Sequence, residues 1–227
     1  MSDPATVVNK GADGADNAGK PAPPYPGDVN PTQAKKGTNA SDDGKKCGTG
    51  AGRGETGIIG LTGTGGQDGG KGEAAAEITW TVDYMTGNYS FQTIGGKGGG
   101  AQVGGPGGDG QIGGPGGNGS SHCGSGQQGE GGPGGTGGQG GQGGDGGAAG
   151  NIFITYDTAK SIPPPVISAS VLPGSGGSSA NGGEGGKGGA GDKAGGRGKS
   201  GNTPTNPGKG GAGGSIYVNG SPIEKVD

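Results

Sequence analysis

Residues 131–148 read GGPGGTGGQGGQGGDGGA, a three-residue repeat in which two residues are glycine. One turn of a polyproline-II-type helix also takes three residues, at roughly 3.1 Å per residue. Two edges of such a helix would carry only glycine, and the third would carry Pro, Thr, Gln, Asp and Ala. Because two edges lack side chains, neighbouring backbones can come close enough to hydrogen-bond. The pattern therefore predicts an architecture before it predicts a function.

Glycine accounts for 70 of the 227 residues, whereas average proteins contain roughly 7%. Hydrophobic residues make up 24% and aromatic residues 4%, too few for a conventional core of Leu, Ile, Val and Phe. Two architectures remain open: a low-complexity disordered chain, or a fold held by hydrogen bonds between glycine-rich helices. Because glycine loses the most backbone entropy on folding, an ordered form must pair nearly all its N–H and C=O groups.

The charge balance and the hydropathy exclude several classes of partner. Lys and Arg total 16 against 19 Asp and Glu, a net charge of −3. No basic stripe is interleaved with aromatic residues, so we expect no nucleic-acid partner. No apolar run approaches about 18 residues, so we expect no membrane span. Residues 1–8 lack a basic start followed by an apolar stretch, so we expect no recognisable signal peptide.

The chain divides by composition into two parts. Residues 1–46 are rich in Pro, Ala and Asp and include PAPPYPG at 21–27, which predicts an extended arm or an irregular first layer. Residues 47–227 form the second part, a repeat domain in which glycine tracts alternate with β-strands.

Three β-branched and aromatic segments, 76–82, 150–156 and 214–219, follow directly on glycine tracts. Their central residues Ile78, Ile152 and Ile216 are about 74 and 64 residues apart. Two of the segments are followed by a turn and a second short strand, at 89–94 and 166–172. We therefore expect about three strand or hairpin modules in a weak internal repeat.

The repeat favours order over disorder. CGTG at 47–50 and CGSG at 123–126 add a second correspondence, and a disordered chain has no reason to place similar strands at equivalent positions. A collagen triple helix is the other competitor, but it needs an uninterrupted Gly-X-Y repeat rich in Pro. Here glycine usually fills the X position as well, and every strand interrupts the repeat.

The runs at 104–109, 113–118, 131–148 and 182–190 resemble those of polyglycine-II bundle proteins, such as snow-flea antifreeze proteins and the adhesin tips of some phage tail fibres. This is a likeness of class that covers about half the chain, and no functional residue is carried over. It implies a mostly irregular or all-β fold, built as a bundle of polyglycine-II helices. The alternation with strand hairpins departs from both families.

Cys47 and Cys123 are the only cysteines and occupy equivalent repeat positions. They are either a disulfide closing a loop of about 76 residues, worth roughly 4 kcal/mol, or two small buried residues. His122 lies beside Cys123, but the spacing does not fit a metal site. Asp109 and Asp145 match the start of a calcium-binding β-roll repeat, but the large aliphatic residue expected two positions later is missing, so calcium is not expected.

The aromatic residues cluster in the strands. Alternation puts Ile78, Trp80 and Val82 on one face of the first segment, and Ile152, Ile154 and Tyr156 on one face of the second. We favour a small apolar layer where the modules stack over an exposed patch that contacts a partner. With a single His and scattered carboxylates, no catalytic cluster is visible. We expect neither an enzyme nor a cofactor.

The leading hypothesis is a non-enzymatic structural or adhesive protein, a rigid scaffold that displays binding loops on a cell surface or an extracellular particle. The loop candidates are 83–88, 159–165 and 199–207. Their partner would be a surface glycan, a protein receptor or another copy of the chain. The residues that we expect to contact it are Asp83, Tyr84, Asn88, Lys160, Pro164, Asn202 and Thr205.

Two alternatives remain. The chain could be the subunit of an extracellular filament or surface layer, because glycine edges and unpaired strand edges are natural docking surfaces between copies. It could also bind ice, as the snow-flea likeness implies, through a flat array of short side chains. The long or charged Gln139, Gln142 and Asp145 argue against ice binding.

Overall fold

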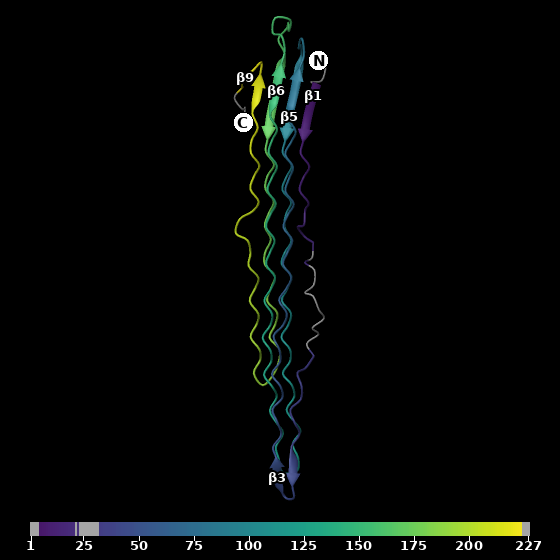
Figure 1. Cartoon of the computed structure of the whole chain (residues 1–227), viewed down its shortest axis with the longest axis vertical. Helices are drawn as coiled ribbons and strands as arrows, with labels where there is room; N and C mark the ends of the chain where they lie inside the picture. The colour runs from purple at the N-terminus through teal and green to yellow at the C-terminus, as the bar shows by residue number, and fades with distance from the viewer. Residues whose placement is uncertain (1–4, 21, 23–31, 224–227) are drawn as a thin grey trace.

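The molecule is a long rod with two small sheets at one end, a hairpin at the other, and extended glycine tracts between them (Figure 1). The computed structural model describes residues 5–20, 22 and 32–223. Within these residues the strands are β1 (Ala5–Lys10), β2 (Ser41–Asp43), β3 (Lys46–Thr49), β4 (Ile78–Thr81), β5 (Asn88–Ile94), β6 (Ile152–Thr155), β7 (Val166–Leu172), β8 (Ile216–Val218) and β9 (Ser221–Pro222).

The sheets at the end of the rod have the strand orders β1-β5-β7 and β4-β6-β8-β9. All pairs are parallel except β8 with β9, which form a hairpin. Asn219 and Gly220 at its turn have φ of 49° and 77°, as expected of a two-residue turn with positive φ at both positions. The three isoleucines singled out above lie in one row, Ile78 beside Ile152 and Ile152 beside Ile216.

The apolar core lies between these two sheets. Phe91 of β5 and Ile152 and Ile154 of β6 are at most 1% exposed, and Trp80 and Tyr156 pack against them. The Trp80 and Phe91 rings meet edge to face, with centroids 5.8 Å apart. The expected small apolar layer between the strand modules is confirmed.

The expected hairpins at 76–94 and 150–172 are wrong. β4 and β5 belong to different sheets, and so do β6 and β7. Each strand–turn–strand unit is therefore an arch that crosses from one sheet to the other. The physical reason is burial: both strands carry one apolar face, and an arch places those faces against each other, whereas a hairpin would lay them side by side.

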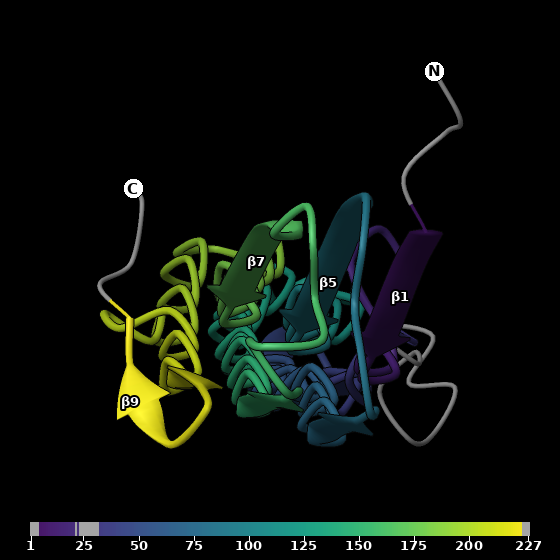
Figure 2. The same ribbon diagram turned by 90° about the horizontal axis from the view of Figure 1, so that it is seen from above.

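Below the sheets the glycine tracts continue as two layers. Tracts 95–119 and 173–190 extend the first sheet, and tracts 50–77, 124–150 and 195–215 extend the second. Within a layer the tracts run parallel and bond at every third residue, as in Gly57 N–H to the Glu130 carbonyl (2.8 Å). Between layers they run in opposite directions, with Gly135 N–H donating to the Gly108 carbonyl (2.8 Å). Looking along the rod, Figure 2 shows β7, β5 and β1 in one row.

The predicted bundle of polyglycine-II helices is wrong. The regular secondary structure of the described residues is strand, in three small sheets, and none of those residues lies in a hydrogen-bonded helix. The tracts are instead extended segments outside regular secondary structure. Bonds between tracts hold them in place, because their backbone N–H groups donate to the carbonyls of neighbouring tracts.

Close approach explains the glycines in the interior of the layers. A Cβ on Gly134 would lie 2.0 Å from the Gly186 carbonyl oxygen, and one on Gly107 would lie 2.2 Å from that of Gly135. Any side chain there would collide with backbone.

Residues of the expected N-terminal arm contribute to the first layer. β1 pairs with β5, and Ala34, Gly37 and Ala40 donate to the carbonyls of tract 112–118. Of the proline-rich stretch 21–27, only Ala22 lies within the described residues.

Candidate functional site

Two loops meet at the sheet end of the rod. One connects β4 to β5 and the other connects β6 to β7. Lys160 Nζ lies 2.7 Å from Asp83 Oδ1 on the first loop and 3.7 Å from Asp157 Oδ2 on its own loop. Ser161, only 2% exposed, donates to the Asp157 carbonyl (2.7 Å) and accepts from Met85 N–H (2.9 Å). A buried hydroxyl and an exposed ion pair therefore hold the loops together.

Large side chains project from this end. Tyr84 is 64% exposed, Ile162 is 78% exposed and Val166 is 65% exposed. Val166 begins β7 and pairs with Asn88, and its N–H donates to the Gly87 carbonyl (2.8 Å). The structure thus brings five of the residues predicted as binding residues to one end of the rod: Asp83, Tyr84, Asn88, Lys160 and Pro164.

The other two predicted residues, Asn202 and Thr205, lie on the flank of the rod. Gly140 and Gly146 donate to the carbonyls of Asn202 (3.0 Å) and Lys209 (2.8 Å), so tract 195–215 has one more residue than its neighbour over this interval. The extra residue makes a bulge at 203–207, the outward step of the yellow-green trace in Figure 1.

Ser179 stabilises this bulge from the other layer. Its Oγ accepts from Gly143 N–H (3.1 Å) and donates to the Asn206 carbonyl (2.7 Å). The sequence predicts a loop at 199–207 but not the role of Ser179. The sequence feature that could have identified Ser179 is its place as a serine within a glycine-rich run.

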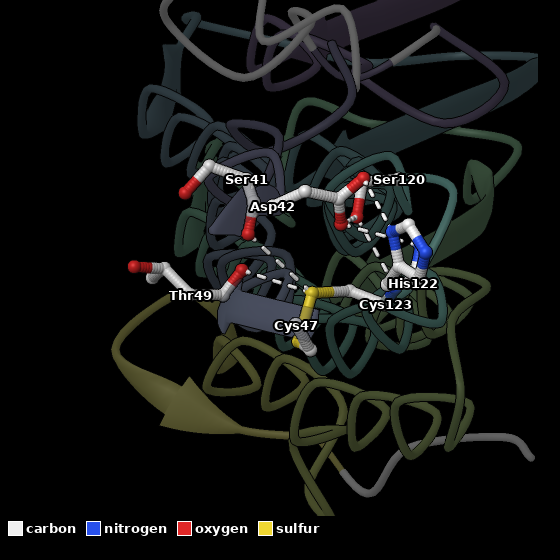
Figure 3. Close-up of polar contacts among 7 residues, drawn as sticks. All are labelled: Ser41, Asp42, Cys47, Thr49, Ser120, His122 and Cys123. Atoms are coloured by element: carbon white, nitrogen blue, oxygen red, sulfur yellow. Dashed lines mark hydrogen bonds and ion pairs between the residues drawn. A yellow bond between two sulfur atoms is a disulfide. The ribbon is translucent and has the colours of Figure 1, made fainter. Parts of the chain in front are cut away.

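The far tip of the rod is closed by the Cys47–Cys123 disulfide, with Cα atoms 4.9 Å apart (Figure 3). Of the two readings of these cysteines, the disulfide is confirmed. It ties the β2–β3 hairpin to the turn at 120–123. Gly44, with φ of 63°, lies in the two-residue turn of that hairpin, where positive φ is required.

Asp42, Ser120 and His122 beside the disulfide do not form a catalytic relay. Asp42 accepts from the Ser120 hydroxyl and from His122 N–H (3.2 Å), and its Oδ2 lies 3.2 Å from His122 Nδ1 (Figure 3). A nucleophilic serine would instead donate to the histidine. The pKa of Asp42 is lowered chiefly by the hydrogen bond from the Ser120 hydroxyl, and further by the hydrogen bonds from His122. The cluster fastens the turn to the hairpin.

Three outward-facing Asp side chains accept hydrogen bonds from backbone N–H groups of a neighbouring tract, a role that the sequence did not predict. Asp109 accepts from Lys187 N–H (2.7 Å), and Asp145 accepts from Lys209 N–H (2.8 Å). Asp13 likewise accepts from Lys97 N–H (2.9 Å), and this bond is the first cause of the lowered pKa of Asp13. The two residues considered for calcium therefore satisfy backbone N–H groups of the next tract.

Among the described residues, no group of three or more His, Cys, Asp or Glu side chains is placed to hold a metal ion. Nor does any helix in that part of the chain have the length and apolar character needed to cross a membrane.

Comparisons with known proteins add little. No family model matches the chain, and no curated protein matches it. Among solved structures, one neighbour is a springtail antifreeze protein from Granisotoma rainieri, described as a bundle of nine polyproline type II helices whose crystal waters match the ice lattice. It is 21% identical, over 76% of this chain and 97% of that chain, with a TM-score of 0.11. A likeness this weak does not assign the chain to the suspected class of glycine-rich proteins.

Proposed function

We propose that this chain is a non-enzymatic adhesive protein, a rod that presents the loops of its sheet end to a protein receptor on another surface. The exposed Tyr84, Ile162 and Val166 on that end carry the proposal. Tyrosine is among the residues that dominate protein interfaces, and apolar side chains exposed together mark interaction sites. Lys160 is neutralised by Asp83 and Asp157, which favours a partner recognised by shape and apolar contact over a strongly charged one.

The long edges of the rod favour a solitary molecule over a laterally growing filament. On tract 50–77, Ile58, Leu61, Thr64 and Gln67 stand where the middle tract has Gly132, Gly135, Gly138 and Gly141. A Cβ on Gly132 would lie 2.0 Å from the Ile58 carbonyl oxygen of tract 50–77. The side chains at the equivalent positions of tract 50–77 therefore occupy the space that a further tract would need. Natural sheets protect their edges by similar means.

The opposite edge is covered by side chains of tract 195–215. Arg197 Nε donates to the Gly185 carbonyl (3.3 Å), and its Nη2 pairs with Glu184 (2.9 Å). Thr203 Oγ1 accepts from Gly182 N–H (3.1 Å). These contacts use backbone groups that a neighbouring molecule would need. The disulfide at the far tip supports an extracellular or surface location, because disulfides persist in oxidising compartments.

Adhesion of protein-coated beads to immobilised cells and receptor ectodomains tests this function. The variant Tyr84→Ala/Ile162→Ser should lose at least about tenfold in binding, because a central interface residue contributes on the order of 2 kcal/mol. Ile59→Ser is the matched control, since Ile59 is 62% exposed but lies on the flank. It should bind like the unaltered protein. Equal losses in both variants, or no binding by the unaltered protein to any surface, would refute the proposal.

A further inference from the structure

We propose that the flank of the rod beside the 203–207 bulge is a binding site for a neutral, linear polysaccharide. This site is separate from the loops at the sheet end and goes beyond the adhesive function proposed for them. A cavity of about 380 Å³ lies on the outer face of the second layer, across tracts 50–77, 124–150 and 195–215. This size is within the range of small-molecule sites, roughly 300–1,000 Å³.

One missing side chain opens this cavity. The outward positions of tract 50–77 carry Thr62 and Asp68, but the position between them is Gly65. A Cβ on Gly65 would have only the Gln139 carbonyl oxygen as a neighbour, at 3.9 Å. Close packing therefore does not require this glycine, unlike the interior ones. Its effect is to leave a hollow on an otherwise covered face.

The lining of the cavity indicates the class of ligand. Its floor is glycine backbone, and its rim carries only hydroxyl and amide side chains: Thr62, Thr136, Gln139, Ser200 and Asn202. No lining residue is charged, which disfavours phosphate or sulfate groups. Methylene groups of the glycines can contact the C–H surface of a sugar ring. The hydroxyls and amides can exchange hydrogen bonds with sugar hydroxyls, because these groups both donate and accept.

A second cavity indicates that the ligand is a chain. It is an open hollow of about 540 Å³, lined in part by Gln142, Asp145, Asn206 and Lys209, beside the same bulge. Gln139 lines the first cavity and Gln142 the second. Three residues of extended backbone span roughly 10 Å, a distance that a linear oligosaccharide can bridge. The bond from Ser179 to the Asn206 carbonyl holds the bulge in place between them.

Filling the hollow tests the proposal. Titration calorimetry with cellohexaose, chitohexaose and maltohexaose should show binding of at least one of them to the unaltered protein. Gly65→Leu should weaken that binding at least tenfold. Gly196→Leu is the matched control: Gly196 is an exposed glycine of tract 195–215 with nothing within 4 Å of a Cβ, and it lines neither cavity. It should leave binding unchanged.

Two further probes separate this site from the sheet end. Tyr84→Ala/Ile162→Ser should bind the oligosaccharide normally, whereas Gly65→Leu should keep bead adhesion to protein receptors. A heparin hexasaccharide should bind more weakly than the neutral probe. The proposal is overturned if none of the three neutral probes binds, if Gly65→Leu binds as well as Gly196→Leu, or if heparin is preferred.

Discussion

The sheet end and the glycine layers are two solutions to the same problem of burying backbone. Between the sheets, side chains such as Phe91 and Ile152 fill the space. Between the layers most positions have no room for a side chain, because a carbonyl oxygen would lie about 2 Å from a Cβ there. The segment that leads into β4 keeps the same neighbouring segment, the one that leads into β6, where glycine packing gives way to the side-chain core. Ala75 N–H donates to the Ala148 carbonyl, and Ile78 N–H donates to the Asn151 carbonyl (both 2.9 Å). Order therefore does not require a side-chain core where glycine lets backbones pair directly.

The largest effect is expected from placing a methyl group between the layers. In Gly134→Ala the new Cβ would lie 2.0 Å from the Gly186 carbonyl oxygen and 2.4 Å from its carbon. Backbone on both sides must then separate, and the hydrogen bonds of several triplets are lost together. We expect a loss of at least about 4 kcal/mol in the free energy of unfolding, at the far end of the range for single substitutions. Chemical denaturation followed by circular dichroism measures it.

Gly196→Ala is the control for that substitution. Its Cβ would meet nothing within 4 Å, so the folded state is unaffected while the unfolded chain loses freedom. We expect a small gain of about 0.4–1 kcal/mol. Equal stability of the two variants would show that the layers are not closely packed in solution.

Sequence patterns predict five of the nine strands of the described residues, missing β1, β2, β3 and β9, and they predict the connections poorly. The β-branched segments around Ile78, Ile152 and Ile216 identify three of the strands and their alignment. In the sequence, the turn at 85–88 resembles a hairpin turn because it contains Gly87. In the structure, Gly87 has a φ of 95°. Burial of Met85 favours an arch in place of a hairpin, because Met85 is 1% exposed and packs in the core between the sheets. Whether a turn closes within one sheet or between two depends on such tertiary burial, which local sequence does not encode.

The next effect belongs to the sheet end. Ile152 is fully buried between the sheets, and Ile152→Ala should lower the free energy of unfolding by about 2–5 kcal/mol. Native-state hydrogen exchange should show faster exchange for the amides of β4, β6 and β8, with the amides of tract 131–148 less affected. Ile162→Ala, at a position 78% exposed, should change stability by no more than about 0.5 kcal/mol. A uniform increase in exchange would mean that the two regions unfold as one unit.

The two candidate sites also differ in how well the sequence predicts them. The loop residues Asp83, Tyr84 and Lys160 could be predicted because they interrupt a recognisable pattern. The hollow at Gly65 could not, because in the sequence this glycine looks like its neighbours. A Cβ on Gly65 would lie 3.9 Å from the nearest carbonyl oxygen, whereas one on Gly63 would lie 2.1 Å and one on Gly66 1.9 Å from a carbonyl oxygen. Residue type alone therefore predicts where the chain can pack closely, but not where it leaves space.

The smallest effect is a pH dependence confined to the glycine layers. The Asp13 carboxylate accepts Lys97 N–H and pairs with Lys10, and these contacts lower its pKa below the ordinary 3.8. A carboxyl whose pKa is lower in the folded state adds stability above its unfolded pKa and loses it as the pH falls through the folded pKa. Amides around Lys97 should therefore exchange faster as the pH drops below about 4, after correction for intrinsic rates. Asp13→Asn should abolish this acid sensitivity, since a neutral amide oxygen still accepts the bond. The core around Phe91 and Ile152 consists of apolar side chains and should show no comparable change. If protection there falls in parallel with that at Lys97, acid acts on the whole rod and the layers have no separate electrostatic stabilisation.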